Sequence, residues 1–365
     1  MKPENNKGKP RLVFIDLLES MAMFAVIFYH SSFYDFNFLQ ESRSLFYIRY
    51  YIRAFCLFCI PSFFLVNGFL LLNHPFDLKK HVQKIIRVVI LTVIWNIITV
   101  ILIMLIKQEY LSPVDFLLRL RRRENGWNTH LWYMHELVVV YLLFPLIKIA
   151  YDTRRDIFTF FIITMVVFTF GNTLLCFLAT MAAHLFLGEN TVYDINWFLD
   201  FNPVRNANGV YYVYFCLGGV IMDIGERFRP LRKTWVCILG ILGSTAGLFA
   251  TGVTLSYISN TIWTTYGHAY EAVFTVTLVI SVFSLCRKFN TENERLKKIL
   301  AAISVNTMGI YFVHILYIQF FWPYVREMAA MNSVSGTLVY TGFIFILSLG
   351  TVLGMKKIPV LKKLV

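Results

Sequence analysis

Apolar residues along this chain gather into ten runs separated by short polar segments. A helix that rises 1.5 Å per residue needs about 20 mostly apolar residues to cross roughly 30 Å of hydrocarbon. The pattern therefore predicts an all-α, polytopic membrane helix bundle with about ten transmembrane helices. The runs lie at residues 12–33, 55–73, 85–106, 131–150, 157–187, 209–225, 235–256, 268–286, 300–322 and 334–355.

The fifth run, residues 157–187, is too long for one straight crossing and contains Gly171 and Asn172. We therefore expect this segment to kink, to tilt strongly or to end in a re-entrant piece. The first run lacks the small-residue exit of a cleavable signal peptide and keeps polar residues within it, so we expect it to be a true membrane helix.

The distribution of Lys and Arg predicts the orientation, because these residues are retained on the cytoplasmic side of a membrane. An even number of helices puts both termini on one side, and 24 of the 34 Lys and Arg residues fall there. We therefore expect both termini in the cytoplasm, with tails at residues 1–11 and 356–365. One outer loop departs from this bias, and we expect it to touch anionic lipid headgroups or to hold an anionic acceptor. It carries Arg119, Arg121, Arg122 and Arg123.

Composition agrees with a membrane protein and excludes several other classes. Of the 365 residues, 58% are hydrophobic and 15% are charged, whereas about 25% are charged in a soluble domain. The net charge of +13 indicates an anionic partner, and the apolar runs identify a membrane surface as that partner. No soluble stretch is long enough to bind nucleic acid, so we expect one integral membrane domain over residues 1–365.

The cysteines and histidines give no sign of a metal or disulfide framework. All six cysteines lie in or beside apolar runs, where a thiol behaves as a small hydrophobe. Cys56 and Cys59 form a C-x-x-C pair, but their apolar setting favours packed thiols over a redox or zinc site. Since the sequence has neither an H-E-x-x-H motif nor a Cys/His zinc pattern, we expect no metal.

Three ionisable residues in the first run are the first candidates for chemistry, because such residues are costly inside a membrane unless paired or hydrated. Asp16, Glu19 and His30 lie within about 60° of one another around a helix. About 16 Å separates Glu19 from His30 along the helix axis. A buried imidazole can take a proton from a hydroxyl or attack an acyl group. Alternatively, His30 is a structural residue bonded to a neighbouring hydroxyl or carbonyl, and spacing alone leaves both interpretations open.

Other polar residues near the ends of the runs are candidate ligand contacts. Lys84 and Arg87 share one helix face and suit the phosphates of a nucleotide-bearing donor, although anchoring to the cytoplasmic surface explains them equally. Trp132 lies with its aromatic neighbours at the outer interface, where aromatic belts are common. Glu136 is deeper and should point into the bundle. His314, in the ninth run, is more often a structural residue in such a setting.

Taken in order, these residues resemble the integral membrane acyltransferase-3 family, and within it the O-acetyltransferases of the enterobacterial common antigen. The resemblance extends over nearly the whole chain. Each block is weak by itself, but the order and spacing over ten helices are fairly specific. The blocks are IDLLESMAMFAVIFYHSS at 15–32, IPSFFLVNGFLLL at 60–72, KIIRVVILTVIW at 84–95, HLWYMHELVVVYLLFPLI at 130–147, GVYYVYFCLGGVI at 209–221 and ISVNTMGIYFVH at 303–314.

The resemblance implies roles for several residues. The family's first-helix histidine corresponds to His30, the acyl-accepting or proton-accepting group, and Lys84 and Arg87 match a basic motif in its K-x-x-R form. The family has an arginine ten intervening residues before that histidine, and Glu19 occupies this position here. Either Lys84 and Arg87 neutralise Glu19 and hold the donor, or ordinary acetyl-CoA chemistry has been lost. Asn67 stands where the family usually has a serine.

By this resemblance the chain is a multi-pass protein of the bacterial plasma membrane. We expect it to transfer an acyl group, acetyl from acetyl-CoA, to a hydroxyl of a glycan or lipid-linked saccharide. His30 and Glu19 are the expected catalytic residues, and Lys84 and Arg87 the expected contacts of the acyl-CoA. The residues expected to contact the acceptor are Trp132, Tyr133, Glu136, Tyr141 and His314.

Two other functions remain open from the sequence. One is a transporter or flippase of a lipid-linked saccharide or exopolysaccharide, in which the polar stripe on the first helix relays protons. The other is an inactive family member that acts as an assembly partner, because the charge reversal at Glu19 can leave a buried partner unpaired.

Overall fold

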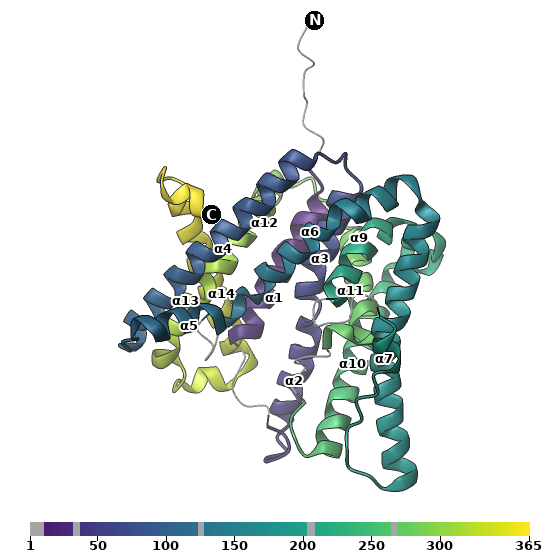
Figure 1. Cartoon of the computed structure of the whole chain (residues 1–365). Coiled ribbons are helices and arrows are strands. Elements are labelled where there is room, and N and C mark those ends of the chain that lie inside the picture. Colours follow the sequence, from purple (N-terminus) through teal and green to yellow (C-terminus); the bar gives the residue numbers. More distant parts are fainter. Residues whose placement is uncertain (1–10, 32–36, 123–127, 203–208, 264–268) are drawn as a thin grey trace, which may run out of the picture.

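The computed structural model describes residues 11–31, 37–122, 128–202, 209–263 and 269–365, and these parts are helical without a strand (Figure 1). The predicted all-α bundle is confirmed. The helices that carry the ten apolar runs are α1 (Val13–Ser31), α2 (Ser44–Cys56) with α3 (Cys59–Leu72), α4 (Leu78–Lys107), α6 (Trp132–Thr153), α7 (Arg155–Leu187), α9 (Gly209–Arg227), α10 (Thr234–Ser259), α11 (Val273–Cys286), α13 (Thr307–Val325) and α14 (Val334–Met355).

Short helices connect the long ones. They are α5 (Pro113–Arg122), η1 (Thr129–Leu131), α8 (Trp197–Asp200), η2 (Arg229–Arg232), η3 (Ala269–Glu271), α12 (Glu294–Ser304), η4 (Ala329–Asn332) and η5 (Leu361–Leu364).

In the described parts of the chain, eight helical segments are long and apolar enough to cross a membrane, with α2 and α3 counting together as one. The two remaining runs form α9 and α11. α11 has 14 residues and rises only about 21 Å. Both helices pack among other helices, and most of their residues are buried. Burial within the protein is enough to explain why α9 and α11 are apolar. That these two helices cross the membrane therefore stays a prediction. The side of the membrane on which the termini lie also stays a prediction.

Two glycines let α3 and α9 approach one another closely. A Cβ at Gly68 would lie 1.8 Å from the carbonyl oxygen of Phe215, and a Cβ at Gly218 would lie 2.1 Å from that of Leu65. Small residues commonly mediate such backbone contact between membrane helices. The close packing fixes α3 beside α1, which lies in the middle of the bundle, while α4 and α6 run side by side (Figure 1).

The long fifth run forms one uninterrupted helix. α7 continues for 33 residues and ends where Gly188 adopts a left-handed φ of 71°. Gly171 faces the ring of Phe198, and the Asn172 amide donates to the Cys176 sulfur, so neither residue breaks the helix. A re-entrant piece is therefore not formed here. A helix of this length rises about 50 Å, which exceeds the hydrocarbon thickness and favours tilt or extension beyond it.

Residues 356–365 fold back onto the bundle. They form turns and η5, and the indole Nε1 of Trp95 on α4 donates to the Leu364 carbonyl at 2.8 Å. Val365 approaches Gly309 at the start of α13. This packing brings the lysines of the last segment to the face of α4 that carries Arg87.

Candidate functional site

His30 lies near the end of α1 and points into the bundle. Its ring centre is 5.4 Å from that of His314 on α13, with the ring planes inclined by 48°. The residue His30 is of intermediate exposure, whereas His314 is fully buried. The imidazole expected from the sequence is therefore directed at other polar groups and not at lipid.

A third imidazole completes this group, which we term the histidine cluster (His30, His130 and His314). The ring centres of His130 and His314 lie 5.7 Å apart, and His130 is 3% exposed. Three separate elements, α1, η1 and α13, supply these rings. Sequence reasoning does not single out His130, because its position beside aromatic residues resembles an interfacial belt.

The histidine cluster contains polar atoms whose partners are missing among the described residues. Nδ1 of His314 lies 2.7 Å from the Tyr311 carbonyl, which requires a proton on that nitrogen and leaves Nε2 as an acceptor. Within the described parts of the chain, Nε2 of His314 and both ring nitrogens of His130 have no hydrogen-bond partner. Buried polar groups are nearly always bonded, so such atoms indicate a place for water or substrate.

Aromatic residues surround the histidine cluster on the side of α6. The Tyr311 hydroxyl donates to the His130 carbonyl, and the Tyr311 and Tyr133 rings are 5.4 Å apart. Trp132 packs on Tyr211, with ring centres 5.3 Å apart. Tyr133, Trp132 and His314, all expected to contact the acceptor, are thus joined to the cluster through one chain of ring contacts.

A buried cation lies next to His30. The Arg53 guanidinium is 3% exposed, sits 4.1 Å from the centre of the Tyr29 ring and donates to the Tyr29 hydroxyl at 3.0 Å. We did not single out Arg53, although an arginine directly before the apolar run AFCLFC is a detectable signal.

Glu19 has a different partner from those expected. It accepts a hydrogen bond from the Ser304 hydroxyl at the end of α12. Arg11 donates to Asp16 at 2.6 and 2.7 Å and to Ser304 at 3.3 Å. The hydrogen bond to Asp16, with the charges of Asp16 and Glu19, raises the pKa of Arg11 against a smaller opposing effect of burial. The described basic group near Glu19 is therefore Arg11, and not Lys84 or Arg87.

Lys84 and Arg87 lie exposed on α4, and Tyr141 is grouped with them. The Lys84 ammonium is 4.4 Å from the centre of the Tyr141 ring, and the Tyr141 hydroxyl donates to Asn67 at 2.6 Å. Burial and the charges of Arg87 and Lys362 lower the pKa of Lys356, which places three cations near one another. We define Lys84, Arg87, Lys356 and Lys362 as the α4 basic cluster.

A second basic site lies at the start of α1. A cavity of about 410 Å³ is lined by the cations of Arg232, Arg287 and Lys288 and by one acidic residue, Glu226, with Phe283 among its apolar residues. The Phe283 ring contacts Phe14, 5.8 Å between centres, so this cavity adjoins the helix that carries His30. We term it the basic cavity.

Glu136, also expected to contact the acceptor, is partly buried on α6. The Arg119 carbonyl accepts from Asn128, Arg121 lies on the same short helix α5, and Arg123 falls outside the described residues. All six cysteines are free. Among the described side chains, no group of three or more His, Cys, Asp or Glu has the arrangement of a metal site.

Comparison with known proteins gives one family match. The sequence model of the acyltransferase-3 family, described as an acyltransferase domain, matches residues 12–354. No curated protein and no solved structure matches the chain. The closer resemblance to O-acetyltransferases of the enterobacterial common antigen stays a prediction. Because the family match covers nearly all of a helical chain with eight candidate membrane spans, the protein belongs to the acyltransferase-3 family and is a multi-pass membrane acyltransferase.

Proposed function

We propose that this protein transfers an acetyl group from acetyl-CoA to a hydroxyl of a glycan or lipid-linked saccharide at a bacterial plasma membrane, with the reaction taking place at His30. The observation that carries the proposal is the histidine cluster, in which three imidazoles from separate elements meet inside the bundle. An imidazole beside buried acceptor atoms suits general base catalysis on a hydroxyl.

In the proposed step, the acceptor hydroxyl gives its proton to a ring nitrogen of His30 while its oxygen attacks the thioester carbonyl. The C–O bond forms as the C–S bond breaks. The departing CoA sulfur takes up the proton held by His30, so the products are an ester and CoA as a thiol. His314 acts as a positioning residue, because its bond to the Tyr311 carbonyl holds its ring in one tautomer beside His30.

The phosphates of acetyl-CoA require basic side chains, and two groups of them are available. The α4 basic cluster contains the residues that the family motif favours, and Lys356 adds to its charge. The basic cavity has a volume within the range of about 300–1,000 Å³ usual for small-molecule sites. We favour the α4 basic cluster, because Lys84 contacts Tyr141, whose hydroxyl bonds to α3 beside α1.

Steady-state kinetics with variants distinguish these two donor sites. Arg87→Ala is expected to raise KM for acetyl-CoA by about 10- to 150-fold with little change in kcat, since one charge-assisted phosphate contact contributes about 1.5–3 kcal/mol. Arg287→Ala should leave KM within about twofold. A large rise in KM for Arg287→Ala, with little change for Arg87→Ala, would instead assign the phosphates of acetyl-CoA to the basic cavity.

The function itself is tested by following thioester cleavage and product mass together. Purified protein in lipid is given acetyl-CoA and a membrane glycan extract, and release of free CoA is measured beside mass spectrometry of the glycans. We expect CoA release that depends on the extract and one acetyl unit added to a glycan. A transporter would release no CoA in any condition, and a faster reaction with a longer acyl-CoA would contradict the acetyl assignment.

A further inference from the structure

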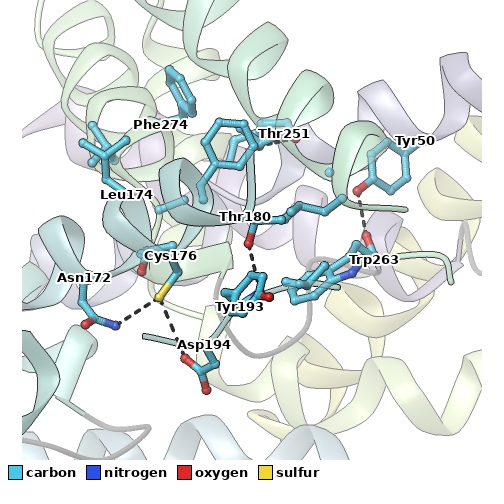
Figure 2. A pocket seen from close by; sticks show the side chains of 18 residues that line it. Tyr50, Asn172, Leu174, Cys176, Thr180, Tyr193, Asp194, Thr251, Trp263 and Phe274 are labelled. Atoms are coloured by element: carbon cyan, nitrogen blue, oxygen red, sulfur yellow. Dashed lines mark hydrogen bonds between the residues drawn. The ribbon is translucent and has the colours of Figure 1, made fainter. Parts of the chain in front are cut away.

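A second cavity of about 250 Å³ has a mostly apolar lining (Figure 2). Its walls come from α2, α7, α10, the first residues of α11 and the segment 188–196. Val273 and Phe274 begin α11, whereas Phe283 near its other end contacts the start of α1. We term it the outer cavity and define it by Tyr50, Cys176, Thr180, Asp194, Trp263 and Phe274.

The polar atoms in the walls of the outer cavity are already bonded to protein. The Tyr50 hydroxyl donates to the Trp263 carbonyl at 2.7 Å. The Thr180 hydroxyl accepts from the backbone N–H of Tyr193 at 3.0 Å (Figure 2). The Cys176 sulfur accepts from the backbone N–H of Ile195 at 3.2 Å. A cavity whose polar atoms are satisfied offers little to water, so its interior favours an apolar occupant.

The outer cavity adjoins lipid-facing residues. Leu174 on α7 is 43% exposed and Phe274 on α11 is 37% exposed, and both line the cavity. α7 and α10 are long apolar helices whose residues are mostly not buried by protein. Hydrocarbon can therefore reach the cavity from the bilayer. A group the size of a water molecule occupies about 30 Å³, so the cavity has room for roughly eight such groups. This is enough for part of one hydrocarbon chain but not for a whole lipid.

The polar rim of the outer cavity is acidic. Asp194 is exposed, and the Tyr193 hydroxyl donates to Glu189. This bond raises the pKa of Tyr193. Residues 172–197, 248–263 and 269–274 contain no Lys or Arg, although the whole chain carries a net charge of +13. An anionic head is repelled here, whereas hydroxyl groups can donate to the carboxylates.

The arginines of α2 bond to groups that do not line the outer cavity. Arg49 donates to the Met331 carbonyl at 3.0 Å, on the side of α13 and α14. Arg53 is buried against Tyr29. Arg53 is nevertheless close enough for its charge to act on Tyr50 in the cavity wall.

We propose that the outer cavity binds one hydrocarbon chain of a membrane lipid whose polar head is uncharged and rich in hydroxyl groups, such as a glycosyl diacylglycerol. The further assignment of this lipid as the acyl acceptor rests on the proposed function. Tyr50 and Arg53 lie one turn apart on α2, and Arg53 contacts Tyr29, the residue before His30. Three side chains therefore lie between the outer cavity and the histidine cluster. They are Tyr50, Arg53 and Tyr29.

Native mass spectrometry of the full chain in detergent tests the inference. The probes are a glucosyl diacylglycerol, a phosphatidylglycerol with the same two chains, and free glucose. We expect the glycolipid to bind at least tenfold more tightly than phosphatidylglycerol. Thr251→Trp fills the cavity and should reduce glycolipid binding at least tenfold, whereas Leu242→Trp, at an outward-facing position of α10 that is 52% exposed, should not.

A charge reversal tests the acidic rim separately. Asp194→Lys should reduce the difference in affinity between the glycolipid and phosphatidylglycerol to about threefold or less. Glu327→Lys, at an exposed residue outside the cavity, should leave this difference unchanged. Equal binding of both lipids to the unmodified protein, competition by free glucose, or no effect of Thr251→Trp would overturn the proposal. Glycolipid binding without any CoA release refutes only the transferase function, and CoA release without lipid binding refutes only the outer cavity.

Discussion

Removal of His30 and His314, singly and together, measures how the histidine cluster works. His30→Ala removes the proposed general base, and we expect kcat to fall by about 10²- to 10⁴-fold, which corresponds to about 2.7–5.4 kcal/mol. The two ring centres are 5.4 Å apart, a separation at which mutational effects stop being independent. Because His314 acts through His30, the double variant should be no slower than His30→Ala, within about threefold.

The assay is CoA release by each purified variant at saturating acetyl-CoA and acceptor. His135→Ala is the matched control, because His135 is an exposed histidine on α6 that bonds to the Leu131 carbonyl at 2.9 Å. His314→Gln, which retains an acceptor atom, should recover part of the loss seen in His314→Ala. If the two single losses multiply in the double variant, His314 contributes independently of His30 and the positioning role is wrong.

Three further predictions follow from the contacts described above. Gly218→Ala forces a Cβ against α3 and should lower stability by about 1–3 kcal/mol, seen as a lower thermal unfolding midpoint, whereas Gly243→Ala, whose Cβ meets no described atom within 4 Å, should not. Lys356 has a lowered pKa, so its charge is present at low pH and is lost as pH rises through that value. KM for acetyl-CoA should therefore rise in alkaline buffer. Because the charge of Arg87 lowers the pKa of Lys356, Arg87→Ala should move this rise to higher pH. If KM depends on pH in the same way in both proteins, Lys356 is not part of the donor site. In Glu19→Arg the new side chain cannot accept the hydrogen bond from Ser304 and places a second positive charge near Arg11. This variant should therefore be less active than Glu19→Gln. If it is more active than the unmodified protein, the contacts described for Glu19 are wrong.

The helices could be predicted from the sequence because hydrophobicity over 20 residues is a local property. The same property could not separate α9 and α11 from the longer spans, since a helix buried in protein is as apolar as one buried in lipid. Gly171 and Asn172 suggested a break in α7, but both are accommodated within it by their contacts.

The site could be predicted only in part, because it depends on which helices pack together. His30 was identified from its place in an apolar run, but the ring contact with His314 and the inclusion of His130 require α1, η1 and α13 to meet. Tyr141 was expected with the acceptor residues, whereas its described contacts include Lys84, Asn67 and His81. Long-range packing of this kind leaves no periodic signal in a single sequence.

Chemical labelling of His30 tests most directly whether its imidazole is reachable by substrate inside the bundle. Protein in membranes is treated with diethyl pyrocarbonate, and the modified histidines are identified by mass spectrometry. We predict that His30 is modified, that acetyl-CoA protects it, and that modification of His135 is unaffected by acetyl-CoA. A His30 that does not react, or that reacts equally with and without acetyl-CoA, would contradict its assignment as the catalytic residue.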